Sequence, residues 1–215
     1  MNITEDIDFR QVLINRIAER EFSVRTGVHC SDLIYCLNKQ ALRRLYPVPD
    51  TDKQVLLYSI GWATQRWLTG KDKDVAEKEV DGIIVTCDDM YEGCPWELKA
   101  SYQSSNRPIE QNMNWVHQIQ AQCYVMESLV AYLSRFELMG NWKIKEGDRP
   151  TLHTYKLEFT QEELDRNWQW LRERKALFQT VLDSGEILPK VLSLPSGQAY
   201  ECQYCNYKEE CKSTQ

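Results

Sequence analysis

The stretch EVDGIIVTCDDMYEGCPWELKAS, residues 79 to 101, decides the fold class. Residues 79–86 and 96–101 are rich in β-branched and apolar side chains, which predicts two strands. The Gly and Pro of residues 87–95 favour a loop that reverses the chain between these strands. The stretch therefore predicts a β-hairpin that belongs to a central sheet.

The second strand of this hairpin carries Glu97 and Lys99, two residues apart, so both side chains leave the same face. If the hairpin turns near Met90, Asp81 lies across from Lys99 and close to Glu97. Two carboxylates then converge, and carboxylate oxygens are the ligands that Mg²⁺ and Mn²⁺ prefer. The pattern indicates a hydrolytic metal site in which Lys99 orients a water or stabilises developing charge. The alternative is an ordinary solvent-facing Glu/Lys pair.

The rest of the chain alternates helical and strand-like segments. Helical spacing of apolar residues predicts helices over 8–22, 31–45, 54–69 and 109–127, the second capped by Ser31. Strands are predicted over 130–140 and 151–159, and Thr160 with Glu163 forms a capping box that begins a long helix. Helices flanking a mixed central sheet make an α/β fold. No linker divides residues 1–215, so we expect a single domain.

The predicted helix over 109–127 carries polar residues on its inward stripe. Met113 and Val116 define that stripe, and Gln120 and Tyr124 continue it. A buried glutamine needs a hydrogen-bond partner, which either the neighbouring backbone or the carboxylate site supplies. A structural and a functional interpretation therefore stay open for this pair.

Composition limits what the protein can bind. The 215 residues carry a net charge of −6 with a pI of about 5.2, so a broad basic surface for nucleic acid is excluded and any such contact is local. Basic residues gather around Lys39, Arg43 and Arg44 and again over residues 166–175. No apolar run approaches the roughly 20 residues of a membrane span, and the start is acidic, unlike a signal peptide. We therefore expect a cytoplasmic protein without a membrane partner.

Eight cysteines in a compartment where disulfides rarely persist predict metal ligands or buried thiols. Cys202, Cys205 and Cys211 form a CxxC followed by a third cysteine, one ligand short of a closed site. The candidates for the fourth ligand are Cys30, Cys36, Cys87, Cys94 and Cys123. Structural zinc usually takes two short-spaced knuckles, so one knuckle with a distant partner favours an iron–sulfur cluster, with zinc as the alternative.

In this order and spacing, VDGIIV, WELKAS and QAQCY resemble the D…ExK…QxxxY pattern of the PD-(D/E)XK nuclease superfamily, in particular its RecB-like branch. The resemblance implies a restriction-endonuclease-like catalytic core within residues 74–160. It implies that Asp81, Glu97 and the Leu98 carbonyl bind Mg²⁺ or Mn²⁺, and that Lys99 is catalytic.

The same resemblance assigns roles to helix residues. It implies that Gln120 and Tyr124 brace the site or the substrate strand. GWATQRWL resembles the GxxxHxxL helix of this branch, in which the His is a metal ligand or contacts the substrate, and here Gln65 stands at that position. An amide oxygen can contact a hard cation or its water, whereas it cannot titrate near neutral pH as His does.

A further part of the resemblance concerns the cysteines. SDLIYCLNKQALRRL is similar to the SxxxxCxxK helix of RecB-like nucleases that carry an iron–sulfur cluster. It implies that a cluster, [4Fe–4S] ahead of [2Fe–2S], is held by Cys36, Cys202, Cys205 and Cys211. Residues 29–46 and 188–211 would then form one subregion that joins the N-terminal helices to the C-terminal tail, with Cys30 as the reserve ligand.

Taken together, these motifs resemble the small CRISPR-associated RecB-like exonucleases and their virus-borne relatives. The resemblance implies metal-dependent cleavage of DNA, typically single-stranded and from a 5′ end, that trims DNA for spacer acquisition. It makes the CRISPR integrase a candidate partner, and the basic clusters make Lys39 and Arg43 candidate substrate contacts. Two alternatives stay open: a DNA repair or recombination nuclease outside CRISPR, and a non-catalytic, metal-stapled DNA-binding protein.

Overall fold

The computed structural model describes residues 4–21, 26–71, 76–103, 108–139 and 150–212 of the chain. Their internal contacts divide them between two units. The first unit comprises Met1–Thr26 and Pro49–Lys73, and the second comprises Gly27–Val48 and Asp74–Gln215. The single domain that we expect over residues 1–215 stays a prediction, and each unit is described by itself.

The first unit consists of two helices, α1 (Ile7–Glu21) and α4 (Asp52–Thr69), which pack on each other. Thr51 caps α4 by accepting a hydrogen bond from the Gln54 backbone, and Gly70 ends the helix at a left-handed φ of 69°. Both helices confirm the segments expected over 8–22 and 54–69.

The second unit contains two sheets. Its strands are β1 (Ala76–Val80), β2 (Ile83–Cys87), β3 (Asp89–Tyr91), β4 (Cys94–Gln103), β5 (Val130–Met139) and β6 (Thr151–Glu158). The first two form a separate hairpin, and the other four form a sheet in the order β3-β4-β5-β6. The central pair β4 and β5 is parallel, and its crossover includes η1 (Ile109–Gln111) and α5 (Met113–Met126). The mixed sheet confirms the expected α/β class.

The pairing of the quoted stretch differs from the expected single hairpin. Asp81 and Gly82 both have positive φ and reverse the chain between β1 and β2, while Glu92 and Gly93 do so between β3 and β4. Asp89 pairs with Trp96, and the strand that precedes Asp81 pairs with β2 instead of β4. The expected alignment of Asp81 with Lys99 is therefore wrong, because an Asp-Gly turn closes a hairpin of its own.

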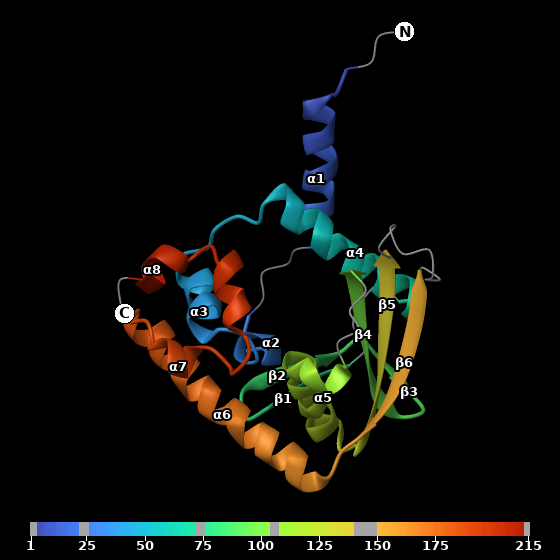
Figure 1. Cartoon of the computed structure of the whole chain (residues 1–215), viewed down its shortest axis with the longest axis vertical. Helices are drawn as coiled ribbons and strands as arrows, with labels where there is room; N and C mark the ends of the chain where they lie inside the picture. Colours follow the sequence, from blue (N-terminus) through green and yellow to red (C-terminus); the bar gives the residue numbers. More distant parts are fainter. Residues whose placement is uncertain (1–3, 22–25, 72–75, 104–107, 140–149, 213–215) are drawn as a thin grey trace. The chain divides into compact units, whose positions relative to one another are not determined.

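The helices of the second unit lie beside this sheet (Figure 1). The expected helix over 31–45 is divided into α2 (Cys30–Leu33) and α3 (Leu37–Leu45), and the N-cap of α2 is His29 instead of Ser31. Thr160 and Glu163 form the expected capping box of α6 (Gln161–Ser184). Figure 1 shows α6, in orange, running from the end of β6 to the C-terminal elements. These elements are α7 (Lys190–Ser193), η2 (Ala199–Tyr204) and α8 (Lys208–Lys212).

The core of the second unit lies where α5 and α6 meet the sheets. One buried cluster contains Ile119, Leu133 and Leu164, so α5 is packed between the four-stranded sheet and α6. A second contains Leu37 and Phe178 and packs α2, α3 and α6 together. Burying a side chain of this size contributes about 1.5–3 kcal/mol to stability. Among the helices described, none has the length and apolar character that a membrane span requires.

Candidate active site and cysteine cavity

The β3–β4 hairpin brings three ionisable side chains together. Glu97 and Lys99 lie on one face of β4, and the Lys99 Nζ donates to Glu97 Oε1 at 2.5 Å. Asp88 immediately precedes β3, its Oδ2 accepts from the Leu98 backbone N–H at 2.6 Å, and its charge acts on Lys99. Glu97 is only 2% exposed, so its charge is held in a largely dry environment.

Two glutamines of α5 complete this cluster. The Gln118 Oε1 accepts from the Lys99 Nζ at 2.9 Å. The Gln122 Nε2 donates to Glu97 Oε2 at 2.5 Å and to the Thr86 carbonyl at 2.9 Å. The two glutamines are four residues apart and so share one face of the helix. Gln122 is fully buried, and within the described residues its Oε1 has no hydrogen-bond partner.

The charges of this cluster act on one another. Burial, the largest single cause, disfavours the charged form of Lys99. The charges of Glu97, Tyr35 and Asp88 together outweigh burial and raise the pKa of the Lys99 ammonium group. Burial, followed by the charge of Glu97, raises the pKa of the nearby Cys30 thiol to about 12. Lys99 is therefore a cation and Cys30 a neutral thiol at physiological pH. Asp88, Glu97 and Lys99 form an acidic pair with an adjacent ammonium, a set that can hold a hard cation beside a phosphate.

Asp81 lies away from this cluster, at the exposed turn between β1 and β2. Its Oδ2 accepts from the Trp168 Nε1 at 3.0 Å and lies 3.6 Å from the Arg172 Nε. Its carbonyl accepts from the Lys175 Nζ at 2.6 Å. These contacts attach the β1–β2 hairpin to α6. The structure does not bring Asp81 to Glu97, and Asp88 occupies the place that the sequence assigned to it.

The expected helix pair is also placed elsewhere. Tyr124 stacks on Trp168, with ring centroids 4.6 Å apart, and so packs in the core. Gln120 is half-buried on α5, while Gln118 and Gln122 make the contacts with the cluster. Gln65 lies in α4 of the first unit, and its contact with a metal stays a prediction.

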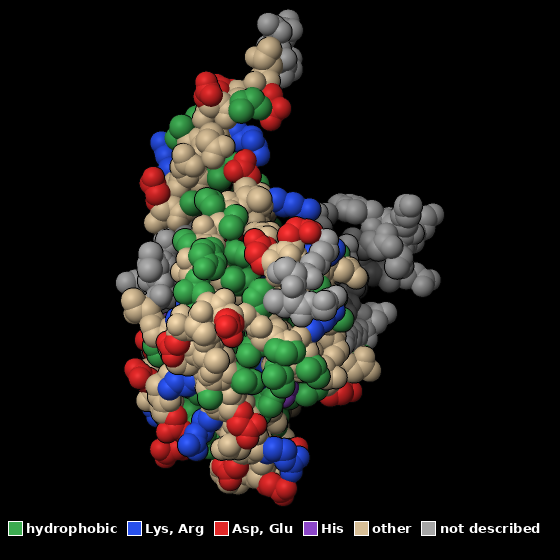
Figure 2. Space-filling model, turned by 90° about the vertical axis from the view of Figure 1, so that its left-hand side faces the viewer, with side chains coloured by type: hydrophobic (Ala, Val, Ile, Leu, Met, Phe, Trp, Pro, Cys, Tyr) green, Lys and Arg blue, Asp and Glu red, His purple; other side chains and the backbone are tan. Residues whose placement is uncertain are grey.

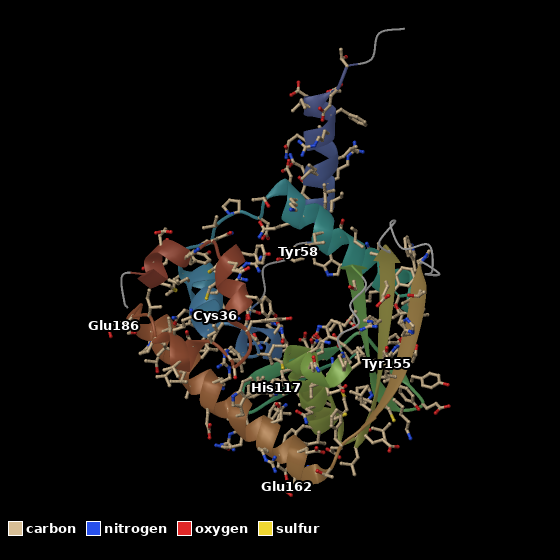
Figure 3. The ribbon with its side chains drawn as sticks, in the orientation of Figure 1. Cys36, Tyr58, His117, Tyr155, Glu162 and Glu186 are labelled. Carbon is tan, nitrogen blue, oxygen red and sulfur yellow. The ribbon has the colours of Figure 1, made fainter. Side chains whose placement is uncertain are left out.

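The second candidate site is a cavity of about 230 Å³ between α3 and the C-terminal elements. Its lining includes the four cysteines of the expected set: Cys36, Cys202, Cys205 and Cys211. Figure 3 shows Cys36 at the start of α3, beside the C-terminal elements drawn in red. Burial, and after it the charges of the other three thiols, raises the pKa of Cys211 to about 11. The four thiols thus share one environment, whereas Cys30 lies in range of Glu97 and Lys99.

Hydrogen bonds join the two chain segments that form this cavity. The Asn38 side chain donates to the Leu188 carbonyl at 2.8 Å and accepts from its N–H at 3.0 Å. The Tyr207 hydroxyl donates to the Tyr46 carbonyl at 2.9 Å, and the Lys39 Nζ lies 4.0 Å from Glu201. Lys39 therefore pairs within the protein. No group of three or more His, Cys, Asp or Glu among the described residues has its side chains already arranged to hold a metal ion.

Comparison with known proteins establishes the fold. No protein family model matches the chain, and no curated protein sequence matches it. The crystal structure of SSO0001 is similar over 96% of each chain, with a TM-score of 0.60 and 15% identity. The crystal structure of a phage-related exonuclease from Haemophilus somnus 129PT is similar over 76% of this chain and 98% of its own, with a TM-score of 0.51 and 11% identity. The chain shares its fold with these two structures.

Proposed function

We propose that the protein is a metal-dependent deoxyribonuclease with its centre at Asp88, Glu97 and Lys99. The observation that carries the proposal is the convergence of these three side chains on the β3–β4 hairpin, with two α5 glutamines bonded to them. A solvent-facing Glu/Lys pair would not be buried beneath a helix that supplies matching amides. The fold shared with a phage-related exonuclease supports the same conclusion.

Each residue has a distinct role in this proposal. Asp88, Glu97 and the Leu98 carbonyl would hold Mg²⁺ or Mn²⁺. Such an ion, when bound, polarises a phosphate and lowers the pKa of its water. Lys99 has three N–H donors, of which Glu97 and Gln118 accept two, so one remains for a phosphate oxygen or the attacking water.

The glutamines orient the groups that react. Gln122 donates to the Glu97 oxygen that Lys99 does not contact, which fixes the carboxylate plane. Gln118 accepts from Lys99 and so limits the positions of its flexible side chain. Such outer contacts set the geometry of metal ligands and are worth about 10–100-fold in affinity or activity.

The finer activity in this proposal is an exonuclease on single-stranded DNA, acting from the 5′ end, with a role in trimming DNA for spacer acquisition beside the CRISPR integrase. The sequence motifs support it. On the face drawn in Figure 2, acidic and basic side chains are interspersed, so the substrate would be held locally rather than by a broad basic surface. A recombination or repair nuclease outside CRISPR is the second candidate, which the likeness to a phage-related exonuclease favours.

We further propose that the cysteine cavity holds an iron–sulfur cluster, [4Fe–4S] ahead of [2Fe–2S], with zinc as the alternative. Four thiols from two distant segments line one cavity, which is the donor set of either group. A volume of about 230 Å³ accommodates either group, and the spacing of the cysteines, one knuckle with a distant partner, favours the cluster. Binding there would stabilise the fold, because an unfolded chain cannot preform the site.

The nuclease proposal is tested with Glu97→Ala, Lys99→Ala and a matched surface pair. Lys156 and Glu158 lie at the same 2.5 Å separation on β6, but both are more than half exposed, so Lys156→Ala is the control. Purified protein is given end-labelled single-stranded and double-stranded DNA with and without Mn²⁺. We expect metal-dependent cleavage by the wild type and the control, and none by the two site variants.

Other outcomes decide against the proposal. Full activity of Glu97→Ala or Lys99→Ala would reject this centre. A wild-type protein that binds DNA but leaves it uncut under every metal would indicate the metal-stapled binding protein. For the cysteine cavity, protein purified without oxygen is assayed for its visible spectrum, iron, sulfide and zinc. A colourless protein loaded with zinc would reject the cluster.

A further inference from the structure

Arg174 is a buried cation on α6 that forms no ion pair with a carboxylate of the described residues. Its side chain is 5% exposed, and no carboxylate of the described residues lies within ion-pair distance. Its donors reach backbone carbonyls instead, those of Leu33, of Tyr35 at 2.6 Å and of Ser193 at 3.1 Å. Carbonyl dipoles satisfy the N–H groups of a guanidinium but leave its net charge uncompensated.

Two of the carbonyls that Arg174 binds lie at or next to residues that line the cysteine cavity. Tyr35 immediately precedes Cys36, and Ser193 lines the cavity directly. Arg174 thus holds the segment that carries Cys36 against the C-terminal tail that carries the other three thiols. The position of the guanidinium is also fixed from its other side, where it lies 4.9 Å from the centroid of Trp170, which stacks on His117 of α5 at 4.2 Å.

The electrostatics of Arg174 point towards an anion in the cavity. Burial lowers the pKa of Arg174 to about 10, and Cys36 and Glu201 act in the opposite direction. Glu201, whose charge acts on Arg174, also lies 4.0 Å from the Lys39 Nζ, so two cations share this carboxylate. Arg174 and Lys39 are therefore two cations beside one carboxylate at the cavity, so positive charge remains to be balanced there.

A buried cation that is only partly balanced destabilises the folded state. Four cysteine thiolates around a zinc ion or an iron–sulfur core carry a net negative charge, which would supply that counter-charge. We propose that Arg174 is the built-in counter-ion of the anionic group held by the four cysteines, and the residue that positions Cys36 for it. The inference rests on the cysteine site proposed above and does not depend on nuclease activity.

The test compares Arg174→Gln and Arg174→Lys with a matched control on the same helix. Arg166 pairs with Glu162 at the surface, where its side chain is 71% exposed, so Arg166→Gln removes the same charge from α6 without touching the cavity. Each protein is loaded with iron and sulfide, or with zinc, and the rate of metal loss to a chelator is recorded. We expect Arg174→Gln to lose the group at least tenfold faster than the wild type, Arg174→Lys to be intermediate, and the control to stay within twofold.

A second measurement distinguishes a counter-ion from a residue that only holds the backbone in place through hydrogen bonds to carbonyls. The midpoint of thermal unfolding is measured for each protein with the group bound and after its removal. A counter-ion makes Arg174→Gln lose more stability in the loaded protein than in the unloaded one, and it shifts the reduction potential of a cluster to more negative values. Equal losses in both states, or a rate of metal loss equal to that of Arg166→Gln, would overturn the inference.

Two further outcomes are distinguishable. If Arg174→Gln does not fold, the same comparison is made with Arg174→Met, which keeps much of the length of the side chain but carries no charge. Equal stability losses with and without the group would again overturn the inference. A wild-type protein that takes up neither iron nor zinc would overturn the cysteine site and this inference with it, and would leave the nuclease proposal standing.

Discussion

Separate substitution of Asp81 and Asp88 distinguishes the two carboxylates that could accompany Glu97. Asp81 accepts from Trp168 and faces Arg172 at an exposed turn, with a left-handed φ of 52°. Asp88 accepts from the Leu98 N–H beside Glu97. The structure therefore predicts that the first substitution affects stability and the second affects cleavage.

The cost of Asp81→Ala follows from three contacts. Alanine in a left-handed conformation costs about 1–2 kcal/mol. Loss of the Trp168 hydrogen bond costs about 1 kcal/mol. The Arg172 pair is about half exposed and screened, so its loss costs at most about 1 kcal/mol. We expect Asp81→Ala to lower the free energy of unfolding by about 2–4 kcal/mol. Asp81→Asn should lower it by less than about 1 kcal/mol, because asparagine tolerates this φ and keeps an acceptor oxygen.

Two assays are made on the same preparations, urea unfolding followed by tryptophan fluorescence and Mn²⁺-dependent cleavage of end-labelled single-stranded DNA. Asp81→Asn should cleave at a rate within about threefold of the wild type. Asp88→Asn should cleave more than about 100-fold more slowly, since a metal ligand matters at least as much as the groups that orient it. An inactive Asp81→Asn of normal stability, together with an active Asp88→Asn, would refute the placement of both residues.

Three other predictions test separate parts of the structure. Gln122→Leu should slow cleavage about 10–100-fold, because Glu97 loses the hydrogen bond that orients its carboxylate. It should change the free energy of unfolding by only about 1 kcal/mol, because the substitution also removes the buried Oε1 that has no partner within the described residues. The DNA assay and urea unfolding measure the two effects, and a wild-type cleavage rate would contradict the prediction. The Cys36→Ser protein should lose its bound metal, whereas the Cys30→Ser protein should retain it. Metal analysis of both purified proteins measures this difference, and equal metal contents would contradict the assignment of Cys36 to the metal site. Burial lowers the pKa of His117, so the unfolded chain binds a proton at a higher pH than the folded chain does, and stability should fall as the pH drops through about 6.5. Unfolding at pH 7.5 and 5.5 should show a smaller drop for His117→Gln than for the wild type, and an identical drop would exclude His117 as the cause.

Local signals in the sequence predicted much of this fold. The capping box at Thr160 depends on residues within one turn, and α6 begins where it indicates. The alternation that places Glu97 and Lys99 on one face depends only on strand geometry, and both side chains meet in the structure. The set of four cysteines lines one cavity, while the group that it holds stays a prediction.

The parts that differ were decided by contacts between distant residues. The register of the strand that carries Glu97 depends on the turn that precedes it. Two Xaa-Gly pairs, ending at Gly82 and Gly93, lie within twelve residues of each other, and each reverses the chain. A turn at Asp81 and Gly82 places Asp81 at the end of a separate hairpin, which makes Asp88 the better partner for Glu97.

The face of α5 that meets the site is a second such case. Met113 and Val116 predict that their side of α5 is the buried one, yet Met113 is 41% exposed. The sheet and α6 decide which side is buried, and they select the face of Gln118 and Gln122. Helical spacing alone cannot distinguish that pair from the equally spaced Gln120 and Tyr124.

The cysteine cavity also imposes an order on events during synthesis. Cys36 leaves the ribosome before the four-stranded sheet is made, while the segment with the other three thiols follows only after that sheet is complete. At about 5–20 residues per second, some 10–30 seconds separate the two segments. In that interval the buried position of Cys36 does not exist, and its thiol meets the metals and oxidants of the cell without its partners. The nascent chain would therefore be most vulnerable to wrong metals and to oxidation before its last turn of helix is complete.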